Sequence, residues 1–198
     1  MDIILIGFIA SFLAGIATSI GALPVFFIKK LSERFEDTSL GFAAGVMLSA
    51  SFFSLIIPGL DYGNEWYKSE GMSLFVVLSG LVIGVLSIWI IQSKAPHEHF
   101  ILGRSHNKAE KAKLSKVWLF IIAITLHNIP EGLAVGIGFG GGDIENGTSL
   151  AMGIGLQNIP EGMAVAFSLI AVGYSRTKAF VIATITGLFE PVFGLLGV

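Results

Sequence analysis

Long apolar segments alternate with short polar segments along the whole chain of 198 residues. Several apolar runs exceed the roughly 20 residues that an α-helix needs to cross a hydrocarbon core of about 30 Å. These runs predict six membrane spans, at about residues 3–28, 39–60, 71–92, 117–139, 148–172 and 178–198. We therefore expect an all-α, polytopic transmembrane helix bundle that forms a single domain over residues 1–198.

The composition agrees with that prediction and removes one class of metal site. Hydrophobic residues make up 54% of the chain and charged residues only 13%, whereas about 25% of an average soluble domain is charged. The chain contains no Cys, so neither disulfides nor thiolate metal ligands can contribute.

The basic residues predict how the spans are oriented. All but Lys68 of the twelve Lys and Arg residues follow the first, third or fifth span, and loops rich in Lys and Arg remain in the cytoplasm. We therefore expect a multi-pass cell-membrane protein with its N-terminus outside and the loop 93–116 in the cytoplasm. The outer loops are net acidic and include Asp61 and Asp143, which would weakly concentrate cations.

A six-residue motif occurs in two consecutive spans, as HNIPEG at residues 127–132 and QNIPEG at 157–162. Glu190 adds a carboxylate in the next span, and no Lys or Arg lies within these three segments. Each motif lies about eight residues, or about 12 Å of helix, from the glycine-rich turn at 140–142. An antiparallel pair of spans would therefore bring the two motifs together near the middle of the membrane.

Carboxylates at this depth need compensation. A charged side chain at the bilayer centre costs about 3 kcal/mol or more, so Glu131, Glu161 and Glu190 must be protonated, hydrated or neutralised by a cation. The i, i+4 spacing puts His127 on the same helix face as Glu131, and Gln157 on that of Glu161. Imidazole, carboxylates and amide oxygens together suit Zn²⁺, and also Fe²⁺, Mn²⁺ or Cd²⁺. The alternative is that these groups only hydrogen-bond the helices to one another.

Proline in each motif predicts a local break. Pro130 and Pro160 cannot donate the usual helical hydrogen bonds to the carbonyls of Leu126 and Leu156. Discontinuous helices form the binding sites of many transporters, so we expect broken helices in the fourth and fifth spans at the metal site.

Two further features are weaker indications of metal binding. The second span carries a stripe of side chains on one helix face, formed by Met47, Ser51, Ser54 and Asp61. The Met47 thioether could complete a site for a borderline metal, although a Met on a helix more often packs against its neighbours. His97 and His99 could collect released metal, but a solvated loop without a binding role is the interpretation that we favour.

The two motifs resemble the signature of the ZIP family of divalent-metal transporters. Gln157 in place of His, together with the stretch MLSASFFSLIIPG from Met47 to Gly59, is similar to the prokaryotic GufA-type branch. The resemblance extends over residues 1–198 and implies a ZIP-type fold of eight spans in a three–two–three inverted repeat. Six spans are present, so we expect the chain to be truncated after its sixth span.

The resemblance also implies two adjoining metal positions that are bridged by carboxylates. The primary position would be formed by Met47, His127, Glu131, Gln157 and Glu161. The second would share both of these glutamates and add Asn128, Asn158 and Glu190. Relatives in this branch can carry Asp where this chain has Asn158, which leaves the second position with one charge fewer. Asp61 would match an acidic residue at the outer entrance.

The implied function is transport, with no enzymatic reaction and no prosthetic group. The expected activity is uptake of Zn²⁺ towards the cytoplasm by alternating access, with Cd²⁺, Fe²⁺ or Mn²⁺ as other substrates. The expected partners are divalent metal ions and the lipid bilayer, and a homodimer is a candidate assembly. One alternative is an intramembrane metalloprotease, although Asn128 occupies the position of the general base in an H-E-x-x-H site. Another is a proton-conducting carrier without metal.

Overall fold

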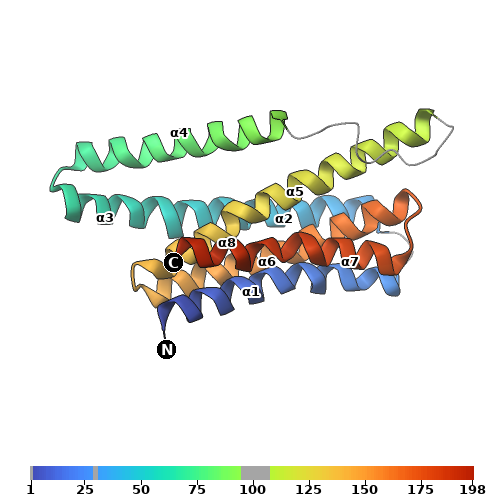
Figure 1. The fold of residues 1–198 in the computed structure, drawn as a ribbon, viewed down its shortest axis with the longest axis horizontal. Helices are drawn as coiled ribbons and strands as arrows, with labels where there is room; N and C mark the ends of the chain where they lie inside the picture. Colours follow the sequence, from blue (N-terminus) through green and yellow to red (C-terminus); the bar gives the residue numbers. More distant parts are fainter. Residues whose placement is uncertain (1, 29–30, 95–107) are drawn as a thin grey trace.

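The computed structural model of the protein describes residues 2–28, 31–94 and 108–198. Every regular element within these residues is helical (Figure 1). Six helical stretches are long and apolar enough to cross a membrane, at Ile3–Phe26, Glu33–Tyr67, Glu70–Ile90, Leu114–Gly140, Ile144–Ala171 and Arg176–Gly197. The predicted multi-pass transmembrane helix bundle is confirmed. His97 and His99 lie outside the described residues.

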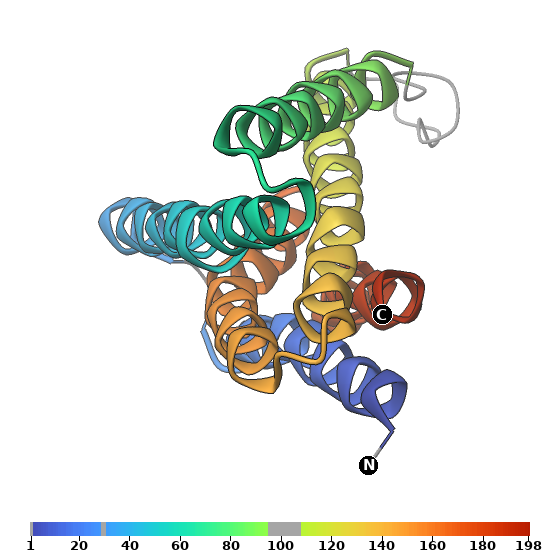
Figure 2. The same cartoon turned by 90° about the vertical axis from the view of Figure 1, so that its left-hand side faces the viewer.

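Helix α6 (Ile144–Ala171) forms the centre of the bundle (Figure 2). It packs against α1 (Ile3–Ala22), α5 (Lys108–Gly140) and α7 (Arg176–Gly187). Helix α8 (Phe189–Gly197) continues the direction of α7 and packs along α5 and α1. These five helices form one packed unit, which we call the central bundle.

Two apolar clusters occupy opposite ends of the central bundle. One lies towards the α5–α6 turn and contains buried Val135, Phe139 and Leu150. The other lies towards the α6–α7 turn and contains buried Ile121, Val165, Leu169 and other residues. Both HNIPEG and QNIPEG fall between the two clusters along their helices, so the polar motifs form a layer inside an otherwise apolar bundle.

The glycine that ends each motif permits close contact between helix backbones. A Cβ atom at Gly162 would collide with the backbone of Thr18 in α1, lying 2.9 Å from its Cα atom. A Cβ atom at Gly132 would collide with the backbone of Glu190 in α8, lying 2.8 Å from its Cα atom. Because Gly132 has no side chain, the Glu190 backbone can lie directly against the first motif.

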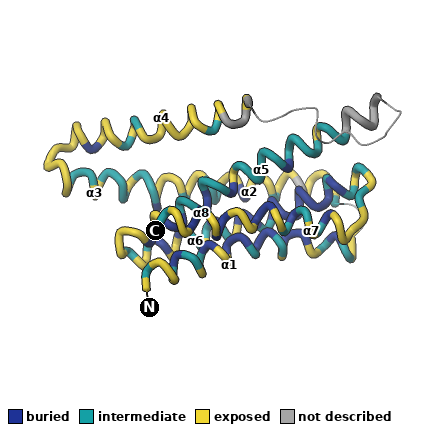
Figure 3. Tube along the Cα trace, viewed as in Figure 1, coloured by how far each residue is buried: buried dark blue, intermediate teal, exposed yellow. Residues whose placement is uncertain are grey.

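The second and third spans lie beside the central bundle. The second span comprises α2 (Glu33–Ala50), a π-helical segment at Ser51–Ile56 and α3 (Ile57–Tyr67). Within it, α2 packs against α6, while α4 (Glu70–Lys94) packs mainly against α3. Figure 3 shows α4 as largely exposed and α6 as largely buried. The exposed residues of α4 are mostly apolar, as expected for a surface that faces lipid.

The breaks expected in the fourth and fifth spans are absent. Helices α5 and α6 continue without interruption through Pro130 and Pro160. Each proline removes a single hydrogen bond, and the neighbouring turns of these tightly packed helices keep theirs. Departures from the α-helix occur instead in three other spans. The first span ends in a 3₁₀ turn at Leu23–Phe26, the second is π-helical just before Pro58, and in the sixth α7 ends at Gly187 before Pro191 in α8.

Candidate metal site

A cavity of about 200 Å³ lies where α2, α5 and α6 meet. Four of the predicted ligands line it, namely Met47, His127, Glu131 and Gln157. Pro130, Ala134, Leu150 and Ile154 complete much of the remaining wall. The structure therefore brings the side chains of both motifs and of the second span to one cavity, and we call these four residues the cavity set.

The two motifs are joined directly by a hydrogen bond within this set. Nε2 of Gln157 donates to Oε1 of Glu131, linking α6 to α5. Gln157 is fully buried and Glu131 nearly so. The amide donates through its N–H group, so its oxygen Oε1 can still accept a hydrogen bond or bind a cation.

The other four predicted ligands are buried and do not line this cavity, and we call them the buried set. They are Asn128, Asn158, Glu161 and Glu190. Nδ2 of Asn158 donates to Oε1 of Glu190 at 2.7 Å and to the carbonyl oxygen of Ala14 at 2.8 Å. Nδ2 of Asn128 donates to the carbonyl oxygen of Thr186 at 2.7 Å. These amides cross-link α5 and α6 to α1, α7 and α8.

One side-chain oxygen in each of six predicted ligands is buried without a hydrogen-bond partner in the described structure. These atoms are Asn128 Oδ1, Glu131 Oε2, Gln157 Oε1, Asn158 Oδ1, Glu161 Oε2 and Glu190 Oε2. Buried polar atoms in folded proteins nearly always have partners, because leaving them unpaired costs free energy. All six are acceptors, so the group that would satisfy them is a proton donor or a cation.

The carboxylates also act on one another. Glu131, Glu161 and Glu190 would repel one another if all three were ionised with no cation between them. A divalent cation would remove this repulsion and satisfy the unpaired oxygens at the same time. The amide N–H groups of Gln157 and Asn158 each satisfy one carboxylate oxygen, on Glu131 and on Glu190 respectively.

His127 is exposed and lines the cavity. Its Nδ1 lies 3.1 Å from the carbonyl oxygen of Ala123, one turn earlier in α5. The tautomer with a proton on Nδ1 would donate to this carbonyl and present the Nε2 lone pair as a ligand. No group of three or more described His, Asp or Glu side chains lies close enough to hold a metal ion. A bound ion would therefore also use the amide oxygens and the Met47 thioether.

The stripe predicted along the second span is divided in the structure. Met47 and Ser51 line the cavity of about 200 Å³, whereas Ser54 lines a neighbouring cavity of about 250 Å³ between the second span and α6. Asp61 is exposed and lines neither of these cavities. The π-helical turn at Ser51–Ile56 causes the division, because its wider turn changes the angular register of the residues that follow.

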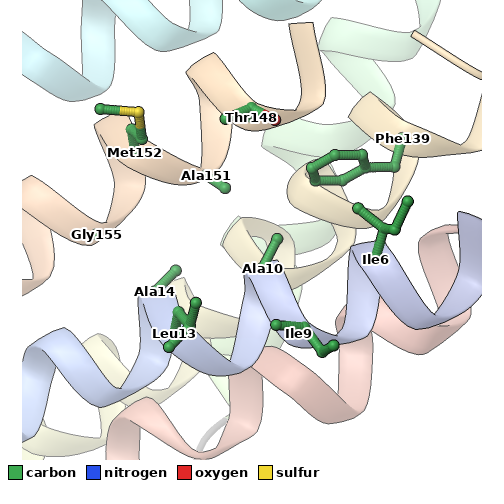
Figure 4. Close-up of a pocket in the computed structure, with 10 residues that line it drawn as sticks. All are labelled: Ile6, Ile9, Ala10, Leu13, Ala14, Phe139, Thr148, Ala151, Met152 and Gly155. Carbon is green, nitrogen blue, oxygen red and sulfur yellow. The ribbon is translucent and has the colours of Figure 1, made fainter. Parts of the chain in front are cut away.

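A larger cavity, of about 480 Å³, lies between α1 and α6 (Figure 4). Ile6, Leu13 and Phe139 are among its lining side chains, and its only oxygen-bearing or sulfur-bearing side chains are those of Thr148 and Met152. Such a lining does not suit a cation, so the smaller cavity remains the candidate site.

Several polar contacts at the site are not evident from sequence patterns. The carbonyl oxygens of Ala14 and Thr186 hold the two asparagine amides, and no side-chain pattern marks a backbone acceptor. A third contact had a readable signal. Pro58 lies four residues after Ser54, whose carbonyl therefore needs a donor from elsewhere, and Asn146 supplies it at 3.1 Å.

Comparison with known proteins adds independent information about the chain. A sequence model of the family described as "ZIP Zinc transporter" matches residues 91–198. The zinc transporter GufA of Myxococcus xanthus is 40% identical over 192 residues, which cover 97% of this chain and 75% of the relative. The zinc transporter ZIPB of Bordetella bronchiseptica is 43% identical over 182 residues, covering 92% and 58%. The zinc transporter ZupT of Chlorobaculum parvum is 35% identical over 205 residues, covering 99% and 75%.

Proposed function

The chain belongs to the ZIP family of metal transporters, and we propose that it moves Zn²⁺ across the membrane, from the outer face into the cytoplasm. The observation that carries this proposal is the set of six buried acceptor oxygens without partners on two helices and α8. The similar transporters from Myxococcus, Bordetella and Chlorobaculum are all zinc transporters by name. Cd²⁺, Fe²⁺ and Mn²⁺ are further candidate substrates, because the same donor types bind them.

The proposed ligands divide into two adjoining positions. In the first, His127, Glu131 and Met47 would bind the ion together with Gln157 and Glu161, after a movement that brings the His and Glu side chains closer than they lie in the described structure. Gln157 would offer its unpaired Oε1, since its N–H group already holds Glu131. In the second, Asn128, Asn158 and Glu190 would share the two glutamates. Nitrogen and oxygen ligands without thiolates bind zinc less tightly than a Cys site, which suits an ion that must be released.

The packing supports a simple division into moving parts. The central bundle carries both motifs and Glu190, whereas the second and third spans pack at its side and contribute Met47. We propose that the central bundle moves as a unit against the second and third spans, and so exposes the metal alternately to the two sides. The distribution of Lys and Arg among the loops supports an orientation with the N-terminus outside and the loop 93–116 in the cytoplasm. A homodimer remains a candidate assembly.

The two rival functions are less consistent with the site. A metalloprotease needs a general base beside its zinc ligand, but Asn128 is an amide and its N–H group is held by the Thr186 carbonyl at 2.7 Å. A carrier of protons alone would not require the Met47 thioether and the Gln157 amide at the same cavity as His127. The similarity to zinc transporters also favours metal over either rival.

Uptake of Zn²⁺ into proteoliposomes that contain the purified full chain and a zinc-sensitive dye tests the proposal. Glu131→Gln and His127→Ala should each lower the initial rate at least about tenfold, because each removes a proposed ligand. Glu33→Gln is the matched control, since Glu33 is exposed at the start of α2, away from the cavity. Uptake and zinc binding at wild-type levels in both ligand variants would reject the assignment.

A further inference from the structure

The carbonyl oxygen of Ser54 lacks its ordinary helical donor. In an α-helix this oxygen would accept from the N–H group of residue 58, but Pro58 has none. The preceding turn is π-helical, with the N–H group of Ile57 donating to the carbonyl of Phe52. Ser54 itself is buried. A buried carbonyl of this kind needs a donor from another part of the molecule.

Asn146 of α6 supplies that donor. Its Nδ2 lies 3.1 Å from the Ser54 carbonyl oxygen, across ninety-two residues of sequence. Asn146 is in the first turn of α6, and its own backbone N–H donates to Oδ1 of Asp143 at 3.0 Å. Asp143 is the N-cap of α6. The Asn146 side chain therefore extends from a capped, well-defined helix terminus to the irregular segment of the second span.

The same irregular segment forms one wall of the metal cavity. Ser51 and Leu55, which flank Ser54 in the π-helical turn, both line the cavity, and so does Met47 one turn earlier. The opposite walls carry Glu131 and Gln157. Next to Ser54 the segment faces a second cavity of about 250 Å³ instead of close side-chain packing. The hydrogen bond from Asn146 is therefore a specific contact that can fix this wall relative to α6.

We propose that Asn146 is a positioning residue for metal binding: by holding the Ser54 carbonyl it sets the distance from Met47 to the ligands on α5 and α6. This inference rests on the proposed function, because it takes the cavity to be the metal site. Asn146 does not line the cavity, so it acts only through the π-helical segment. Loss of the Asn146 donor should weaken Zn²⁺ binding although all of the proposed metal ligands remain present.

Asn146→Asp is the most informative variant, because a carboxylate keeps the size of the side chain but cannot donate. The apparent KM for Zn²⁺ in proteoliposome uptake should rise about tenfold, the effect of losing a group that orients a metal ligand, with Vmax within about twofold of wild type. Zinc affinity measured by titration calorimetry should fall by the same factor. Asn146→Gln retains a donor and should recover most of the affinity.

Two controls separate positioning from other effects. Ser69→Asp introduces the same charge at the exposed turn between α3 and α4 and should leave KM unchanged, because Ser69 does not line the cavity. Met47→Leu removes the thioether at similar volume. If Asn146 acts through Met47, Asn146→Asp should add little to the effect of Met47→Leu, because residues in one pathway are not additive.

The inference is overturned if Asn146→Asp binds zinc like wild type, if it lowers Vmax with KM unchanged, or if its effect adds fully to that of Met47→Leu. Should the Asp variant fail to yield folded protein, Asn146→Ala removes the same donor without a charge and is judged by the same criteria. Glu131→Gln separates a failure of the proposed metal site from a failure of the positioning role of Asn146. Retained zinc binding in Glu131→Gln would reject the proposed function, whereas loss there beside a silent Asn146→Asp would reject only the positioning role.

Discussion

Gln157 donates a hydrogen bond to Glu131, so the first residue of the second motif is joined to the fifth residue of the first motif across α5 and α6. One motif thus supplies a donor to the carboxylate of the other. The bond orients Glu131 and leaves Gln157 Oε1 and Glu131 Oε2 unpaired. In this pair, one contact joins the helices and leaves two acceptor oxygens unpaired, so a structural role is compatible with the proposed metal-binding role.

This relationship predicts different results for two substitutions of Gln157. Gln157→Leu removes the donor to Glu131 and an oxygen ligand, and should weaken zinc binding at least about tenfold. Gln157→His keeps a polar side chain that can bind zinc, as His127 would in the first motif, and should retain most of the binding. Titration of each purified variant with Zn²⁺ measures the effect. Equal affinities in the Leu variant and the wild type would show that this amide is not a ligand.

Asn158 allows a test of the amide cross-links without transport. Its Nδ2 donates to both Glu190 and Ala14, at 2.7 and 2.8 Å. Asn158→Asp loses both donors and adds a carboxylate beside Glu190, so the metal-free protein should be destabilised by about 1–3 kcal/mol. Bound zinc should restore part of this loss by neutralising the extra charge. Thermal unfolding with and without Zn²⁺ measures both effects.

The control for that measurement is Ser69→Asp, which adds a carboxylate at an exposed residue outside both ligand sets. Ser69 Oγ accepts from the N–H group of Met72 at the start of α4, and an Asp side chain can accept there too, so the stability should stay close to that of the wild type. A metal-free Asn158→Asp protein as stable as the Ser69→Asp protein would show that the cross-links contribute little to the fold.

The motif glycines predict an effect on folding. Gly162→Ala would place a Cβ atom against the Thr18 backbone, and backbone cannot move aside as a flexible side chain can. We expect a loss of about 1–3 kcal/mol in stability from overpacking. Gly80→Ala in α4 is the matched control, because no atom lies within 4 Å of its added Cβ. Chemical unfolding in detergent compares them, and equal stability of the two variants would contradict the close α1–α6 approach.

The six spans and the buried carboxylates of the candidate site could be predicted from the sequence because both signals are local. A run of apolar residues requires a span whatever surrounds it, and a carboxylate such as Glu161 within one is unusual in any context. The second span extends beyond the predicted end at residue 60, as far as Tyr67. Its polar final turns lower the hydropathy without ending the helix, which is why hydropathy alone placed the boundary too early.

The departures from the α-helix could not be predicted because they depend on partners far away in sequence. Pro130 and Pro58 look alike in sequence, since each lies within an apolar span. Pro130 lies inside continuous α5, whereas Pro58 follows a π-helical turn in which the Ser54 carbonyl accepts a hydrogen bond from Asn146. The difference lies in the neighbouring helix, and only the three-dimensional packing shows it. Division of the Met47–Asp61 stripe has the same origin.

Zinc should stabilise the protein through the cavity and buried sets together. An ion that binds only the folded state adds about 2.7 kcal/mol of stability at a concentration of 100 times its Kd, so Zn²⁺ should raise the melting temperature, and a chelator should reverse the rise. Glu131→Gln should abolish most of this shift, because the proposed function gives Glu131 a role in both metal positions. Glu33→Gln should preserve it. A shift of equal size in both variants would mean that the stabilising ion binds elsewhere, and the unpaired oxygens would then need a different partner, such as water or protons.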